Sequence, residues 1–263
     1  MIQIKLGFCL HDDWAATKPD LLNELDRLGF DGVEIWAKGV EVLGGDGLEQ
    51  IVNRHSFEIA SLNPYFDFTT SDETFRRSLD VCEHYVSLCA RVSCHRLRTF
   101  TSPLGSFASS DDAGDEAWRR ATDGIRAVCD MATPHGVTAV MEVHFGAGQL
   151  YDTSEAALRL LRDVDRPGLT VNLELPLRGE DFAQSAECLG HVVTHVHASN
   201  WVGEWGKFTL LDQGVVDYEA FLSILAAHGF DGYVSIEHAK ADPVGYARHD
   251  AEYLRTVFER IAS

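Results

Sequence analysis

Positive charge is scarce in this sequence. Only 22 Lys and Arg residues stand against 41 Asp and Glu residues, which gives a formal net charge of −19 over 263 residues. Such a chain repels a polyanion such as duplex DNA at long range unless a local basic groove exists, and the sequence contains no basic stripe. We therefore expect no nucleic-acid partner and attribute the charge to solubility.

Long hydrophobic runs and paired cysteines are also missing. No apolar run approaches the roughly 18 residues that a membrane-spanning helix needs. None of the six cysteines forms a C-x-x-C pair, which argues against zinc-ribbon and thioredoxin-like proteins. Most of these cysteines lie in apolar helical stretches, as buried free thiols do in a reducing compartment. The sequence therefore predicts a cytoplasmic protein without membrane association.

The sequence does contain eight alternating strand-like and helix-like segments. The predicted strands are residues 4–11, 33–37, 59–64, 96–101, 138–144, 170–175, 192–199 and 233–238. The predicted helices are residues 19–30, 47–55, 73–90, 115–133, 154–164, 182–189, 218–228 and 244–261. Strict alternation predicts parallel strands, because each crossover between them needs a helix. Eight such units in this length predict one (β/α)₈ TIM barrel, a single domain over residues 1–263.

An open, doubly wound sheet is the structural alternative to a barrel. Such a sheet normally has a glycine-rich phosphate loop after its first strand. Here the first predicted strand ends in the segment 9–12 (CLHD), which contains no glycine. The alternative is therefore disfavoured.

Glycines before several predicted strands allow the strand ends to be aligned. Three carboxylates follow such glycines at nearly equal distances, with Glu142 six residues after Gly136, Glu174 six after Gly168 and Glu237 five after Gly232. All three are therefore expected at the carboxyl ends of their strands. That face of a barrel is where active sites form.

A fourth polar residue, His197, ends the strand predicted between the last two of these carboxylates. Carboxylates gathered in a low-dielectric mouth repel each other unless a cation lies among them. Three carboxylates and one imidazole suit a hard or borderline divalent ion. We predict one divalent metal ion bound by Glu142, Glu174, His197 and Glu237. Mn²⁺ is the first expectation, with Mg²⁺, Co²⁺ and Zn²⁺ as alternatives.

Several sequence segments match a known pattern in order and spacing, namely residues 28–34 (LGFDGVE), 141–144 (MEVH), 152–157 (DTSEAA), 195–197 (HVH), 214–218 (GVVDY) and 229–237. Together they resemble the sugar phosphate isomerase/epimerase family of xylose-isomerase-like barrels, which also includes endonuclease IV. The resemblance covers almost the whole chain. It implies a barrel with one catalytic metal held by a Glu-Asp-His-Glu set, which corresponds here to the four residues already named.

The chain departs from this family pattern at three positions. Glu174 stands where the family usually has Asp, and its longer side chain can still reach a metal. The family's sugar epimerases commonly place a His three residues after that Asp and an Arg shortly after the seventh-strand His. Here those positions hold Leu177 and, approximately, Gly203. Two groups that usually hold the substrate of a ketose 3-epimerase are therefore missing.

The predicted function is a metal-dependent isomerase or epimerase of a small polyhydroxylated carbonyl substrate, a sugar or a sugar-like compound. The metal would polarise the carbonyl group, while Glu142 and Glu237 would transfer the proton. A lyase or dehydratase on the same scaffold is the alternative enzyme, since the same enolate can expel a β-hydroxyl group. A non-catalytic ligand-binding barrel is the competing class. The expected partner is a small molecule, and the oligomeric state stays open, a homo-oligomer included.

Other polar and aromatic residues near strand ends are candidates for contact with the substrate. The predicted set is His11, Trp36, Asn63, Arg98, His144, Trp201 and Lys207, with Tyr65, Trp205 and His238 as further candidates. Two polar loops, residues 105–114 and 200–215, are expected to open on the same mouth and act as lids. Glu34 is interpreted as an interior structural carboxylate rather than a metal ligand.

The charge predicts that this protein neither binds duplex DNA specifically nor incises abasic sites. The expectation rests on the net charge of −19 and on the shortage of His ligands for additional zinc ions. An incision assay on an abasic oligonucleotide, with Mn²⁺ or Zn²⁺ present, checks it. Metal-dependent incision at low enzyme concentration would contradict it.

Overall fold

The computed structural model of the chain describes residues 4–145, 150–238 and 242–262. Eight parallel strands close into a barrel in the order β1-β10-β7-β6-β5-β4-β3-β2. These strands are β1 (Lys5–Leu10), β2 (Gly32–Trp36), β3 (Glu58–Asn63), β4 (Arg96–Thr99), β5 (Thr138–Val143), β6 (Leu169–Glu174), β7 (Val193–Ala198) and β10 (Tyr233–Ile236). The predicted TIM-barrel fold is confirmed.

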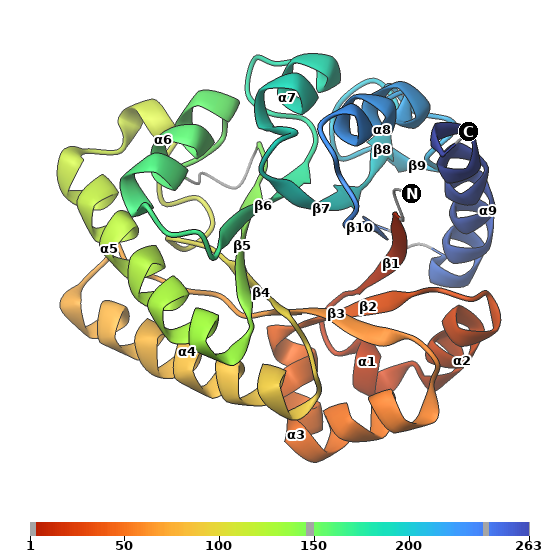
Figure 1. Cartoon of the computed structure of the whole chain (residues 1–263), viewed down its shortest axis with the longest axis horizontal. Coiled ribbons are helices and arrows are strands. Elements are labelled where there is room, and N and C mark those ends of the chain that lie inside the picture. The colour runs from red at the N-terminus through yellow and green to blue at the C-terminus, as the bar shows by residue number, and fades with distance from the viewer. Residues whose placement is uncertain (1–3, 146–149, 239–241, 263) are drawn as a thin grey trace.

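The α-helices form an outer layer around the barrel (Figure 1). They are α1 (Trp14–Thr17), α2 (Pro19–Arg27), α3 (Ala37–Arg54), α4 (Asp72–Arg91), α5 (Asp115–Ala132), α6 (Ser154–Val164), α7 (Phe182–Leu189), α8 (Tyr218–Ala227) and α9 (Pro243–Ile261). Two short 3₁₀ helices, η1 (Ser110–Asp112) and η2 (Thr133–His135), lie beside α5 in the sequence. None of the described helices combines the length and apolarity that a membrane crossing requires.

Side-chain caps explain where several helices begin. Each capping side chain accepts a hydrogen bond from a backbone N–H in the first turn of the helix that follows. The capping residues include Thr153, Asp181, Asp217 and Asp242. Such a cap satisfies one of the N–H groups that a helix start leaves without a partner. The polar residues between the strand and helix patterns therefore fix the points at which the chain turns back along the barrel.

The structure differs from the sequence prediction mainly in the connections. The helix α1 was not predicted, and α3 begins at residue 37 rather than 47, with a non-helical break at Gly44. The second predicted lid, residues 200–215, contains a small antiparallel hairpin of β8 (Asn200–Trp201) and β9 (Phe208–Thr209). Short elements of this kind carry too few residues for a hydrophobic period to be recognised.

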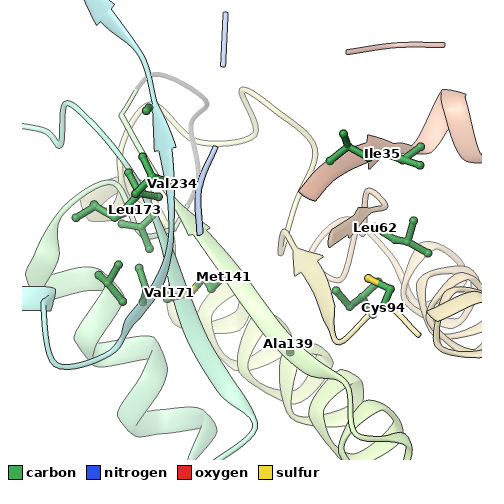
Figure 2. Close-up of a cluster of buried hydrophobic side chains, with 14 of the residues drawn as sticks. Ile35, Leu62, Cys94, Ala139, Met141, Val171, Leu173 and Val234 are labelled. Carbon is green, nitrogen blue, oxygen red and sulfur yellow. The ribbon is translucent and has the colours of Figure 1, made fainter. Parts of the chain in front are cut away.

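Alternation along the strands separates an apolar layer from a polar interior. On β5, Met141 and Val143 belong to the hydrophobic core, whereas Glu142 between them bonds to a side chain from β4. Figure 2 shows part of the apolar set, including Met141, Val171 and Leu173. Successive side chains of a strand point to opposite faces, so residues between these apolar positions enter the barrel. The fold thus places polar side chains on the inside, where the site lies.

We predict that Gly232→Ala destabilises the barrel, because an added Cβ would lie 1.9 Å from the backbone carbonyl oxygen of Thr194 on β7. Overpacking against backbone typically costs about 1–3 kcal/mol of unfolding free energy. Urea denaturation followed by circular dichroism measures the effect. Gly114→Ala is the matched control, since its added Cβ meets no atom within 4 Å. Equal midpoints for the two variants would show that the β10 start can shift freely.

Candidate active site

The four predicted metal ligands lie together at the carboxyl ends of neighbouring strands. Glu142 is on β5, Glu174 ends β6, His197 is on β7, and Glu237 directly follows β10. Ligand atoms of Glu142, Glu174 and His197 lie within 4.8 Å of one another. The Nδ1 atom of His197 is 3.4 Å from Glu142 Oε1 and 3.3 Å from Glu237 Oε2. All four residues are buried.

The site carries more negative charge than its own side chains neutralise. Burial and the neighbouring Glu237 raise the pKa of Glu174. Burial alone would lower the pKa of His197, but the surrounding carboxylates raise it well above its ordinary value. A proton on His197 would therefore serve as the cation that the carboxylates require.

These residues fit a divalent ion by charge and by donor type. His197 Nδ1 and Glu237 Oε2 are both buried and have no hydrogen-bond partner among the described residues. Buried polar atoms normally find a partner, so such atoms facing one another are a place where an ion can complete their bonding. Carboxylate oxygens and an imidazole nitrogen are ligands that Mn²⁺, Co²⁺ and Zn²⁺ accept.

Arg98 on β4 is the buried positive charge beside this cluster. Its Nη1–H donates to Glu142 Oε2 at 2.8 Å. Three aromatic rings surround the guanidinium, with their centroids 5.2 Å (Trp36), 4.9 Å (Tyr65) and 4.6 Å (Phe100) from its central carbon. Burial alone would raise the pKa of Glu142, but Arg98 and His197 lower it to about 2. Glu142 is therefore held as a carboxylate.

A cavity of about 160 Å³ opens above the cluster. Its polar lining residues come mainly from strand ends, and its apolar residues come mainly from the connections that follow the strands. The lining residues are Trp36, Tyr65, Arg98, Phe100, Leu104, Glu142, His144, Glu174, Trp205, Glu237 and His238. Charged side chains thus form the floor of the cavity, and aromatic side chains form its wall. This arrangement suits a small ligand with polar groups on one side.

Two histidines flank Glu174 in this cavity. His238 Nε2–H donates to Glu174 Oε1 at 3.0 Å, and the His238 ring stacks on Phe208 with centroids 3.9 Å apart. His144 Nδ1 lies 3.5 Å from Glu174 Oε2. Neither ring nitrogen of His144 has a hydrogen-bond partner within the described ranges. His144 is therefore available to a bound molecule, whereas His238 is held by its neighbours.

Among the predicted substrate contacts, Trp36, Arg98 and His144 line the cavity, as do the further candidates Tyr65, Trp205 and His238. His11 lies behind this wall, where its ring packs against Trp36 at 4.6 Å and its Nε2 accepts the His238 backbone N–H.

The structure places the other three predicted contacts away from the cavity lining. Asn63 is inside the barrel, and its amide donates to Glu34. Trp201 is buried in the β8–β9 hairpin, paired with Phe208. Lys207 is exposed and forms an ion pair with Glu204 at 3.1 Å. A role for these three in substrate binding, like closure of the two loops, stays a prediction.

Two lining residues, Phe100 and Leu104, were missed by the sequence analysis. Phe100 is two positions after Arg98, so strand alternation gives it the same face and could have identified it. Leu104 belongs to an irregular connection, and no periodicity predicts where its side chain points.

Comparisons with known proteins agree with the barrel fold. Residues 22–257 match a family described as the xylose isomerase-like TIM barrel. A 3-dehydroshikimate dehydratase of Bacillus anthracis is 28% identical over 181 residues, which cover 65% of this chain and 62% of that enzyme. The chain thus spans less than two thirds of that enzyme's length.

Solved structures show the same fold at lower identity. A D-allulose 3-epimerase from Methylomonas sp. superimposes with a TM-score of 0.82 at 17% identity, covering 98% of this chain and 99% of that one. The IolI protein, whose structure holds a zinc atom, superimposes with a TM-score of 0.78 at 18% identity and covers 98% of each chain.

We predict that Glu142→Gln, Glu174→Gln, His197→Ala and Glu237→Gln each lower the content of bound metal. Each change removes one donor from a set of four, which should exceed the roughly 10–100-fold loss of affinity typical of an outer-shell change. Elemental analysis after dialysis against limiting Mn²⁺ or Zn²⁺ measures the content. Glu252→Gln, at an exposed carboxylate of α9, is the control.

Stoichiometric metal in all four variants would exclude this ligand set. Retention in Glu174→Gln alone would mean that Glu, in the position where the family has Asp, lies outside the coordination shell.

Proposed function

Because this chain belongs to the xylose isomerase-like TIM barrel family, we propose that it is a divalent-metal-dependent enzyme. Its reaction removes a proton next to the carbonyl group of a small polyhydroxylated substrate. Glu142 and Glu237 lie 3.4 and 3.3 Å from the unpartnered Nδ1 of His197 at the floor of a cavity, with Glu174 close to this cluster, and this arrangement carries the proposal. A metal ion bound there would act as a Lewis acid that polarises the carbonyl group and acidifies the neighbouring C–H bond.

Glu237 is the carboxylate best placed to accept the proton. It lines the cavity, and its Oε2 has no hydrogen-bond partner in the described part of the chain. Burial alone would raise the pKa of Glu237, but His197 and His238 lower it well below its ordinary value. The group is therefore ionised at neutral pH and can act as a base.

Glu142 is poorly suited to return a proton to the opposite face of the substrate. Its Oε2 already accepts the Arg98 Nη1–H at 2.8 Å, and protonating Glu142 would leave this buried guanidinium without its counter-charge. The ion pair accordingly holds the Glu142 pKa at about 2, whereas Glu237 Oε2 has no hydrogen-bond partner among the described residues and can bind a proton. This observation favours a reaction that needs only one carboxylate base, and we propose that the enzyme is a dehydratase.

In this dehydration the chain's own residues account for each proton. Glu237 takes the proton from the α-carbon, and the electron pair of that C–H bond forms the new carbon–carbon double bond. The bond to the β-hydroxyl group breaks, and His144 donates a proton so that the group leaves as water. Solvent then restores both side chains. The activity of the dehydratase relative from B. anthracis supports this choice.

Isomerisation or epimerisation is the second candidate. It is favoured by the placement of Glu142 and Glu237 at 3.4 and 3.3 Å from the same His197 atom, since two carboxylates near one reacting carbon can exchange its proton between faces. This route requires Glu142 to act as an acid despite Arg98.

Turnover in D₂O distinguishes these reactions. We expect the metal-loaded protein, offered a panel of cyclic and open-chain hydroxyketones, to form an α,β-unsaturated product that ultraviolet absorbance detects. Glu237→Gln should lower the rate by about 10²–10⁴-fold, the usual contribution of a general base. His144→Gln should slow water loss and leave deuterium exchange at the α-carbon, measured by NMR, in place.

Wild-type exchange in a Glu237→Gln variant that retains its metal would exclude Glu237 as the base. Formation of an epimer or isomer without loss of water would establish the second candidate in place of the first.

A further inference from the structure

Glu34 on β2 lies inside the barrel, directly beside the histidine of the metal site. Its side chain is buried and receives four side-chain contacts. His195 Nε2 lies 2.7 Å and Cys9 Sγ 3.5 Å from Oε1. Asn63 Nδ2 lies 2.9 Å and His197 Nε2 3.1 Å from Oε2. These partners come from β1, β3 and β7, so one carboxylate joins several strands across the barrel interior.

The chemistry of these partners fixes the direction of the hydrogen bonds. Asn63 Oδ1 already accepts the Ser61 hydroxyl at 2.7 Å, so the Asn63 NH₂ group faces Glu34 and donates. The Cys9 thiol also donates to Glu34. An ionised carboxylate only accepts hydrogen bonds, so an imidazole nitrogen beside it must carry a proton. His197 therefore presents Nε2–H to Glu34.

This assignment determines which His197 nitrogen is available to a metal. A neutral imidazole has one N–H and one lone pair, and each nitrogen takes one of them. With the proton on Nε2, the lone pair lies on Nδ1. That atom faces Glu142 and Glu237 and has no hydrogen-bond partner among the described residues.

We infer that Glu34 is a positioning residue for the metal site. It selects the His197 tautomer with Nε2 protonated and so presents the Nδ1 lone pair to the ion, while His195, Asn63 and Cys9 hold Glu34 in place. A carboxylate behind a ligating histidine also orients the ring and makes its free nitrogen more basic. The inference rests on the proposed metal site. It adds to that site a supporting residue, Glu34, whose side chain contacts neither the metal nor the substrate.

Glu34→Gln tests this role with nearly the same shape. The amide has a nitrogen donor in place of one carboxylate oxygen, so it cannot accept a bond at every position where Glu34 does. We expect zinc affinity, measured by competition with a chelator, to fall about 10–100-fold. Ser235→Ala is the matched control, because it removes a hydroxyl 3.0 Å from His195 Nε2 and leaves the Glu34 contacts in place. Its zinc affinity should equal that of the wild type.

Nitrogen-15 NMR of histidine-labelled protein supplies a readout that a structural role alone would not change. In the zinc-loaded wild type, His197, assigned by its loss in His197→Ala, should show a protonated Nε2 and a metal-bound Nδ1. Metal bound through Nε2 would overturn the inference, even if Glu34→Gln failed to fold.

Wild-type zinc affinity in a folded Glu34→Gln variant would also overturn it. Glu142→Gln separates this failure from failure of the metal site. If that variant loses zinc, the site stands and only the role of Glu34 is wrong. If it and the other three ligand variants all retain zinc, the proposed site itself is wrong.

Discussion

Burial of carboxylates inside the barrel is the constraint on which the site depends. The buried acidic residues of the interior are Glu34, Glu142, Glu174 and Glu237. Each loses its water on folding, a cost that only hydrogen bonds and opposite charge offset. The hydrogen-bond partners of Glu34 and Glu142 come from other strands, as when Arg98 of β4 bonds Glu142 of β5. Because these contacts cross between strands, the geometry of the closed barrel and the charge balance of the site depend on each other.

The positions of the predicted ligands could largely be anticipated because they follow from regular structure. A glycine ends each preceding loop, and a strand of nearly constant length then carries Glu142 and Glu174 to the same height. Alternation along the strand decides that these side chains enter the barrel while their apolar neighbours face the helices. The barrel fold and the common height of Glu142, Glu174 and Glu237 could therefore be predicted from alternation and spacing. Their assignment with His197 as one metal-binding set also drew on donor chemistry and on the family resemblance, and it stays a prediction.

Positions governed by the connections could not be derived in this way. Asn63 ends β3 at the height of a substrate contact, yet its amide turns to Glu34, a partner 29 positions earlier in the chain. Trp201 and Trp205 lie in the same predicted loop, but the β8–β9 pairing buries the first and leaves the second at the cavity. Such choices depend on long-range contacts, which periodicity does not encode. The Arg98–Glu142 ion pair could not be predicted for the same reason, although it bears directly on the proposed reaction.

The charged floor of the cavity and its aromatic wall come from different parts of the fold. Glu142 and Glu174 belong to hydrogen-bonded strands, whereas Leu104 and Trp205 belong to connections that pair with fewer neighbours. Loops tolerate replacement far better than the strands that support them. A library that varies residues 102–109 and 202–207 would therefore sample new cavity shapes over an unchanged set of buried charged side chains, which makes this barrel a suitable starting scaffold for selecting cavities that fit different small molecules.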